Sequence, residues 1–159
     1  MGRNADERGR TGMGPLRTLV IALQVLVGAN AIAGGWAALS NPRSPFGIPV
    51  EALRRGPFQD FLIPGLALVL VLGLGHLASA AMTLFRARLF PYAIAVMGGV
   101  TVVWIFVQCY VMETVNPLQA AIFAVGVLEG LYACHLLISG RMFPFSLVWR
   151  ILGKDGRGR

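Results

Sequence analysis

The stretch FLIPGLALVLVLGLGHLASAAMTL, residues Phe61–Leu84, decides the fold of this chain. It contains no Asp, Glu, Lys or Arg. A helix of this length, rising about 1.5 Å per residue, crosses the roughly 30 Å apolar core of a bilayer. Pro64 lies in the first turns, where backbone amides lack helical partners in any case, so the helix tolerates it. We predict a transmembrane helix with one histidine, His76, in its interior.

Three further apolar runs flank this segment, and we predict spans over residues 16–39, 91–112 and 118–139. The competing interpretation of the first run is a signal peptide, because Arg residues precede it and Ala31-Ile32-Ala33 resembles a cleavage site. The run continues to Leu39, which is a spanning length and favours a retained helix.

The composition indicates a membrane protein without a separate soluble domain. The chain has 56% hydrophobic and 13% charged residues, whereas about a quarter of the residues in soluble domains are charged. The predicted fold class is therefore all-α, a four-transmembrane-helix bundle formed by one domain over residues 16–139, with the lipid bilayer as its surroundings.

The polar segments predict short surface elements. Residues 1–15 form a polar tail that we expect to be disordered in the cytoplasm. In the first connection, Pro49–Arg55 predicts a short interfacial helix with Val50 and Leu53 toward the membrane, since proline suits a first helical position and Gly56 follows as a terminator. Residues 140–159 begin with an amphipathic stretch, predicted to be an interfacial helix, and end in a disordered basic tail.

The positive charges lie mostly on one side of the predicted bundle. Four spans place both termini on the same side of the membrane. In membrane proteins the cytoplasmic segments contain more Lys and Arg residues than the segments on the other side. The net charge of +7 follows from this asymmetry and does not indicate a nucleic-acid partner. We predict cytoplasmic termini because the side with both termini carries Arg3, Arg8, Arg10, Arg17, Arg86, Arg88, Arg141, Arg150, Lys154, Arg157 and Arg159, and the other only Arg43, Arg54 and Arg55.

Polar residues inside the spans are the candidate functional residues, because each is costly in lipid and faces the bundle interior. Measured from the cytoplasmic ends of their spans, Gln24, His76 and Glu129 lie roughly 12–15 Å deep. Tyr132 and His135 lie nearer that end on the fourth span. These residues form a predicted inner polar cluster. An outer polar layer contains Asn30, Gln108 and Glu113.

Three interpretations of the inner cluster remain open. The first is a purely structural role, in which polar side chains join helices through hydrogen bonds. The second is a proton-titratable site, in which Glu129 and His76 share a proton or bind a polar ligand. The third is haem or chlorin ligation through His76 or His135, although these two histidines differ in depth by about 6 Å.

Small residues one helical turn apart predict close helix packing. The pairs are Ala31 and Gly35, Gly75 and Ser79, and Gly126 and Gly130, each allowing close backbone approach. Cys109 and Cys134 form no CxxC motif and are interpreted as small hydrophobic residues. No nucleotide-binding, hydrolase or metal-binding motif occurs, so the sequence indicates no catalytic residue and no metal site.

The residues Gly56-Pro57-Phe58, Pro64-Gly65, Trp104-Ile105 and Glu129 carry a resemblance to small four-helix bacterial inner-membrane proteins. In size and topology the chain also resembles the DoxX-like four-helix family. The resemblance covers roughly residues 16–137. It implies a four-helix architecture and a bacterial inner-membrane location, and it implies no activity.

The sequence thus favours a non-catalytic accessory or structural subunit of the membrane. Its expected partners are other membrane subunits or further copies of itself, packed through the glycine faces. The alternative is a small carrier or sensor that uses the residues around Gln24, His76 and Glu129 to bind a proton, a ligand or a haem or chlorin cofactor.

Overall fold

The structure, a computed structural model, describes residues 14–140, 142 and 143. It is all-helical over these residues, and four of its helical segments are long and apolar enough to cross a membrane. The first is α1 (Pro15–Ser40). The second joins α2 (Leu62–Ala67), a π-helical turn η4 (Leu68–Gly73) and α3 (Leu74–Leu84). The last two are α4 (Phe90–Met112) and α5 (Pro117–Ser139). The chain is a multi-pass membrane protein.

Proline starts three of these helices. Pro15, Pro91 and Pro117 each lie in the first turn of their helix, where no intrahelical amide bond is lost. At the start of α5 a capping box adds to this effect, because the Asn116 side chain accepts from the Gln119 amide and Gln119 bonds back to Asn116. The sequence therefore sets the helix starts locally.

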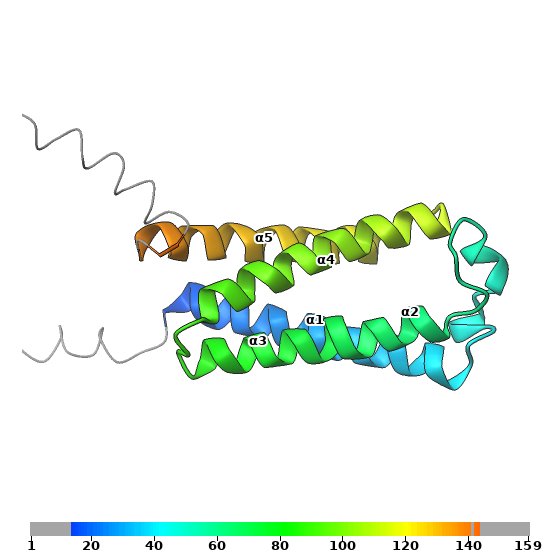
Figure 1. The fold of residues 1–159 in the computed structure, drawn as a ribbon, viewed down its shortest axis with the longest axis horizontal. Coiled ribbons are helices and arrows are strands. Elements are labelled where there is room, and N and C mark those ends of the chain that lie inside the picture. Colours follow the sequence, from blue (N-terminus) through cyan, green and yellow to red (C-terminus); the bar gives the residue numbers. More distant parts are fainter. Residues whose placement is uncertain (1–13, 141, 144–159) are drawn as a thin grey trace, which may run out of the picture.

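The four spans form two antiparallel pairs (Figure 1), one made by α1 with the second span and the other by α4 with α5. The end where Arg17, Arg86 and Arg88 lie is called the basic end here, and the opposite end, covered by residues 41–61, the loop end. At the basic end α4 packs against α3, whereas at the loop end the backbones of α4 and α2 lie farther apart. The two pairs therefore diverge toward the loop end.

Glycines bring α1 and the second span together at two levels. A Cβ on Gly35 would lie 2.7 Å from the Gly65 carbonyl oxygen, and one on Gly28 would lie 3.1 Å from that of Gly73. The two glycines on α1 are seven residues apart in the sequence, and the two on the second span, Gly65 and Gly73, are eight residues apart. Eight residues of α-helix rotate about 80° beyond two full turns, which would move Gly73 off the interface. The π-turn between them absorbs the extra residue and keeps both glycines facing α1.

This geometry predicts that the second span tolerates loss of one residue within the π-turn. Deletion of exposed Leu70 leaves Gly65 and Gly73 seven apart, so a regular α-helix presents both to α1. We expect a folded protein with nearly unchanged thermal stability in detergent. Deletion of exposed Val103 from α4, which has no π-turn, is the matched control. It rotates the following residues by about 100° and should abolish a cooperative unfolding transition; equal behaviour of the two deletions would contradict the role assigned to the π-turn.

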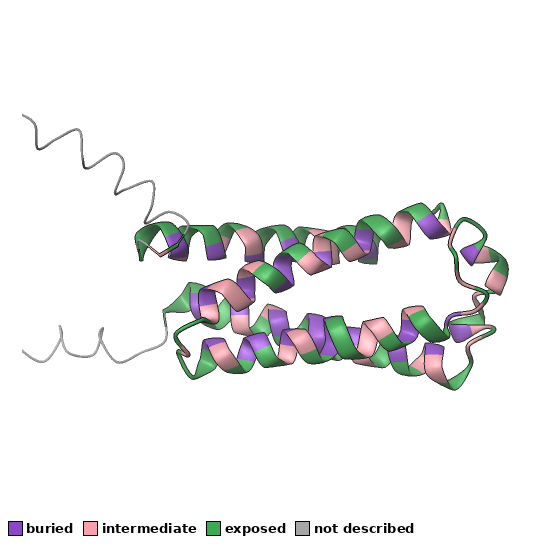
Figure 2. Cartoon of the chain, viewed as in Figure 1, coloured by how far each residue is buried: buried purple, intermediate pink, exposed green. Residues whose placement is uncertain are grey.

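The second helix pair also packs through glycine. A Cβ on Gly98 would lie 2.7 Å from the Gly126 carbonyl oxygen and 2.9 Å from the Gly130 amide nitrogen. Backbones of α4 and α5 therefore touch at this level. Exposed residues lie along all spans (Figure 2), and many of them are large and apolar, as expected for surfaces that contact lipid.

The connection at the loop end folds over the bundle. The short helix predicted over Pro49–Arg55 is a single 3₁₀ turn, Val50–Leu53. Leu53 is buried in an apolar cluster with Ala38, Phe61 and Val111, so this turn packs onto the bundle rather than presenting Leu53 to the membrane. Nearly all of the predicted N-terminal tail and of the predicted helix over residues 140–159 lies outside the described residues.

Candidate functional site

A polar cluster lies in the interior of the bundle. His76, Gln24, Glu129, Thr83 and Thr101 are each 0% exposed, and the polar side chain of Ser79 is buried with them. They come from all four spans: Gln24 from α1, His76 and Thr83 from α3, Thr101 from α4 and Glu129 from α5. Because burying polar groups costs free energy unless they are paired, this cluster is the candidate functional site.

His76 and Glu129 form the centre of the site. The His76 Nε2 lies 3.5 Å from Glu129 Oε2, and both side chains are completely buried. The same nitrogen lies 3.1 Å from the Thr101 hydroxyl oxygen. On the other side of the ring, Nδ1 lies 2.8 Å from the Leu72 carbonyl oxygen, one turn earlier on the second span. Three spans therefore meet at one imidazole.

The hydrogen bonds around His76 link its protonation to Thr101. A carbonyl oxygen can only accept, so Nδ1 carries a proton and donates to Leu72. The Thr101 hydroxyl has one proton and lies 2.9 Å from the Met97 carbonyl oxygen. When Thr101 donates to Met97, Nε2 must donate, and His76 is an imidazolium. When Thr101 instead turns to donate to Nε2, His76 is neutral. The geometry thus accommodates both forms of the histidine.

Glu129 has unused hydrogen-bonding capacity. Among the described residues, none makes a hydrogen bond with either carboxyl oxygen. A carboxylate can accept about four hydrogen bonds, and an unsatisfied buried oxygen costs about 1–3 kcal/mol. The side chain is held in place by packing, because α5 meets α4 closely at Gly98, where an added Cβ would lie 3.1 Å from the Glu129 Cβ.

Gln24 connects α1 to the same helix as His76. Its amide nitrogen donates to the Ser79 hydroxyl at 2.8 Å, and its oxygen has no partner among the described residues. One turn further, the Thr83 hydroxyl donates to the Ser79 carbonyl, and Arg17 donates to the Thr83 and Leu84 carbonyls. Arg17 therefore caps the C-terminal end of α3, where backbone carbonyls lack helical partners.

An apolar layer lies between the His76–Glu129 pair and the basic end. Val20, Ile94 and Ala133 form a buried cluster from α1, α4 and α5, and Ile94 and Ala133 are 0% exposed. Val20 is one turn from Gln24, and Ala133 is one turn from Glu129. Tyr132 packs half-buried against this layer. The His76–Glu129 pair therefore has apolar neighbours on that side, whereas the polar contacts of Gln24, Ser79, Thr83 and Arg17 run along α1 and α3 to the basic end.

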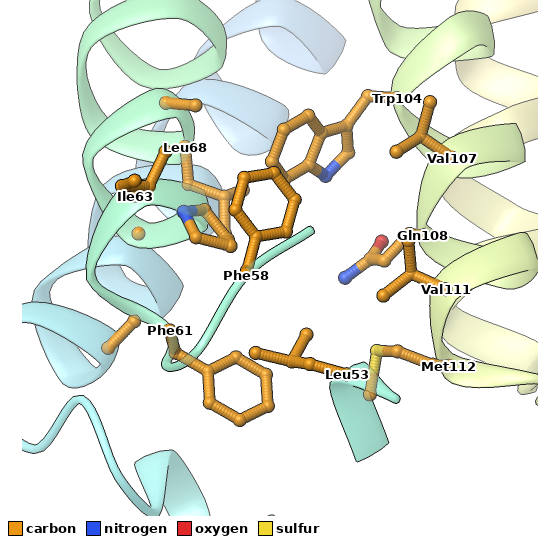
Figure 3. A pocket seen from close by; sticks show the side chains of 14 residues that line it. Leu53, Phe58, Phe61, Ile63, Leu68, Trp104, Val107, Gln108, Val111 and Met112 are labelled. Carbon is orange, nitrogen blue, oxygen red and sulfur yellow. The ribbon is translucent and has the colours of Figure 1, made fainter. Parts of the chain in front are cut away.

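On the opposite side, the site lies close to a cavity between the two helix pairs. This loop-end cavity has a volume of about 350 Å³ and extends from the connection at the loop end down to Val27, Leu72 and Ile105. Each of these three residues lies one helical turn from Gln24, His76 or Thr101, respectively. A smaller hollow of about 120 Å³ adjoins it (Figure 3), and both share Trp104, Gln108, Phe61 and Met112 as lining residues.

The inner cluster is smaller than the sequence predicts. Gln24, His76 and Glu129 are all buried in the interior, but Tyr132 is only half-buried and His135 is exposed. His135 follows Glu129 by six residues, which is about 240° around a helix, so it faces away from the bundle. His76 is buried in the interior and His135 is exposed, so the structure does not bring the two histidines to one site for paired haem ligation. In the described residues no group of three potential metal ligands occurs.

The predicted outer layer does not form a single cluster. Asn30 is exposed and bonds to the Leu26 carbonyl of its own helix, although it also lines the loop-end cavity with Gln108. Glu113 ends α4 in a left-handed conformation and pairs with Arg55 of the first connection at the surface. Asn30 and Gln108 therefore line one cavity, whereas Glu113 lies at the surface.

The predicted small-residue pairs have unequal roles. Gly35 and Gly126 lie at close helix contacts, and Ala31 is buried on the same face of α1 as Gly35. A Cβ on Gly75 would meet the Met97 side chain at 2.8 Å, and the neighbouring Ser79 is the partner of Gln24. A Cβ on Gly130 would meet nothing within 4 Å.

Three residues of the site are missing from the sequence-based prediction. Only the structure shows that Thr101 and Thr83 belong to the site and that Arg17 caps α3. A signal for the first two exists in the sequence: Thr83 is seven residues from His76 and so shares its face, and Thr101 lies at a depth near that of His76 on its own span.

Comparison of the chain with protein-family models, with curated proteins and with solved structures gives no match.

Proposed function

We propose that this membrane protein is a small carrier or sensor whose His76–Glu129 pair binds and releases a proton inside the bilayer. The observation that supports this most strongly is the completely buried Glu129 carboxyl group, 3.5 Å from His76 and without a hydrogen bond among the described residues. Polar side chains that only join helices contribute roughly 0.6 kcal/mol through their hydrogen bonds. Among the described residues Glu129 makes no such bond, so a hydrogen bond that joins helices does not account for its burial.

The pair holds one proton between its two members in its neutral state. An imidazolium facing a carboxylate and an imidazole facing a carboxylic acid have the same net charge of zero. Transfer breaks the O–H bond of Glu129 and forms the N–H bond at His76 Nε2, while the Thr101 hydroxyl turns from Nε2 to the Met97 carbonyl. Uptake of a second proton, from water, leaves His76 an imidazolium beside a protonated Glu129, with a net charge of plus one.

The test is infrared spectroscopy of the full chain in lipid nanodiscs, recorded as the pH is changed. We expect a protonated-carboxyl band to appear reversibly together with bands of the imidazole ring. The Glu129→Gln variant should lose the carboxyl band and alter the imidazole bands. Glu113→Gln, which removes a surface carboxyl paired with Arg55, is the matched control and should keep both. A wild-type spectrum in which neither group of bands changes with pH would refute the proposal.

The proposed location is the bacterial inner membrane, with the basic end and both termini in the cytoplasm. This rests on the resemblance to small inner-membrane proteins and on the excess of Lys and Arg in the segments at the basic end. The charged residues of the connections at the loop end, in contrast, balance one another: Arg43, Arg54, Arg55, Glu51, Asp60 and Glu113. A cysteine introduced at exposed Arg43 should react with a membrane-impermeant maleimide in intact spheroplasts, and one introduced at exposed Arg86 should not.

A second candidate is the accessory subunit, and a groove on the lipid-facing side favours it. The groove lies between α4 and the second span and has a volume of about 540 Å³. Its lining is mostly valine, and it contains the small residues Ala67, Ala95 and Gly99. Small residues at a membrane surface allow close approach of another helix. Purification in mild detergent tests this role: a defined membrane partner that is lost in Gly99→Phe supports it, and recovery of the chain alone refutes it.

A further inference from the structure

We propose that the loop-end cavity is a binding site for a neutral, membrane-soluble organic molecule with one carbonyl or hydroxyl group. The cavity lies between the two helix pairs, on the loop-end side of the His76–Glu129 pair. Binding there requires no proton exchange at that pair, so this inference stands independently of the proposed function.

The size and lining of the cavity define the ligand. Its volume of about 350 Å³ is in the range of small-molecule pockets, which begin at about 300 Å³. Its walls are mostly apolar, with aliphatic side chains and the rings of Phe61 and Trp104, and they include the polar side chains of Asn30 and Gln108. An uncharged, largely apolar occupant fits this lining, and an ion does not.

Gln108 supplies the recognition of a polar group. Its side chain lines the loop-end cavity together with Trp104, and it also points into the adjoining smaller hollow (Figure 3). A primary amide offers two donors and one acceptor oxygen. In an apolar cavity it therefore binds a single carbonyl or hydroxyl group of a ligand and orients the rest of the molecule against the aromatic rings.

The wall formed by the first connection is conformationally strained. Phe46 has a φ of +52°, in the left-handed region that non-glycine residues rarely adopt, and it is followed by Gly47 with a φ of +79°. Phe46 and its neighbours Pro45 and Ile48 line the cavity. Strained backbone of this kind occurs at ligand clamps, where the surrounding structure holds it in place. The connection thus forms a wall at the mouth of the site.

Photolabelling with benzophenone tests the site, because this ketone is neutral, apolar and membrane-soluble. The full chain in nanodiscs is illuminated with benzophenone, and the modified residues are mapped by mass spectrometry. We expect saturable labelling of cavity residues, with Met112 prominent. Gly34→Phe should reduce this labelling at least tenfold, because Gly34 lines the cavity and its added Cβ meets nothing within 4 Å. Gly99→Phe makes the same substitution at an equally open position in the lateral groove and should leave it unchanged.

A competition experiment isolates the role of Gln108. Fluorenone and fluorene share a skeleton, but only fluorenone has a carbonyl group. Fluorenone should compete with benzophenone about threefold to tenfold better than fluorene, the factor expected from one hydrogen bond. In Gln108→Leu this advantage should disappear, while fluorene competes as before. An equal advantage in the variant would overturn the assignment of Gln108.

Two results would overturn the site itself. One is unsaturable labelling, spread evenly over lipid-facing residues of all four spans. The other is equal labelling of the cavity in the Gly34→Phe and Gly99→Phe variants. Both variants are first shown to keep the wild-type thermal unfolding transition, and a cavity-filling Ala33→Phe variant replaces Gly34→Phe if that protein does not fold.

Discussion

His76→Ala is expected to destabilise the folded bundle by about 3–5 kcal/mol, the cost of removing one partner of a buried charged pair. The substitution removes the ion-pair partner of the Glu129 carboxyl, and the described residues contain no other. It also removes the links from α3 to the Thr101 hydroxyl and, within its helix, to the Leu72 carbonyl. The measurement is reversible unfolding in mixed micelles, with the free energy of unfolding obtained for variant and wild type.

Two comparisons make this prediction specific. His135→Ala alters the chain's other histidine, which is exposed on α5, and should change the free energy of unfolding by less than about 0.5 kcal/mol. In the double variant His76→Ala/Glu129→Gln the remaining side chain carries no charge, so most of the lost stability should return. If His76→Ala and His135→Ala cost the same, the buried pair does not stabilise the fold in the way described here.

Gly98→Ala should destabilise the protein by about 1–3 kcal/mol, whereas Gly99→Ala should be neutral or slightly stabilising. The added methyl of Gly98→Ala meets the Gly126 carbonyl oxygen at 2.7 Å, and backbone cannot move aside as a flexible side chain can. At Gly99 the methyl meets nothing within 4 Å. Alanine there gains up to about 1 kcal/mol of helix propensity over glycine.

A second pair of neighbouring glycines repeats this comparison on α1. Gly35→Ala would place a methyl 2.5 Å from Val69 and 2.7 Å from the Gly65 carbonyl oxygen, and Gly34→Ala meets no atom within 4 Å. Thermal unfolding of all four variants in one detergent gives the test. Equal losses of thermal stability in the Gly34 and Gly35 variants, or in the Gly98 and Gly99 variants, would contradict the close helix contacts at Gly35 and Gly98.

The sequence predicts the membrane spans well because they depend on a one-dimensional property. A run such as residues 61–84 must be apolar and long enough to cross the bilayer, and both conditions can be counted along the chain. The observed helices begin and end within one residue of the predicted spans. Prolines at helix starts mark these boundaries locally, as at Pro117.

The candidate site is predicted only in part. Counting residues along each span places His76 and Glu129 at one depth, and in the structure they are 3.5 Å apart. The same count includes His135, which is exposed, and omits Thr101, which is completely buried at His76. Depth follows from the rise per residue, but the direction of a side chain around the helix axis depends on the neighbouring helix.

The sequence by itself therefore determined the four spans, their ends and the depth of the polar residues, because bilayer thickness and helix rise fix these quantities. Only the tertiary structure decided which residues meet. The π-turn in Leu68–Gly73 sets the rotation of His76, and the close contact at Gly98 brings Glu129 opposite it. The divergence of the two helix pairs opens the loop-end cavity. Each of these results depends on packing between helices far apart in the sequence, which no local pattern encodes.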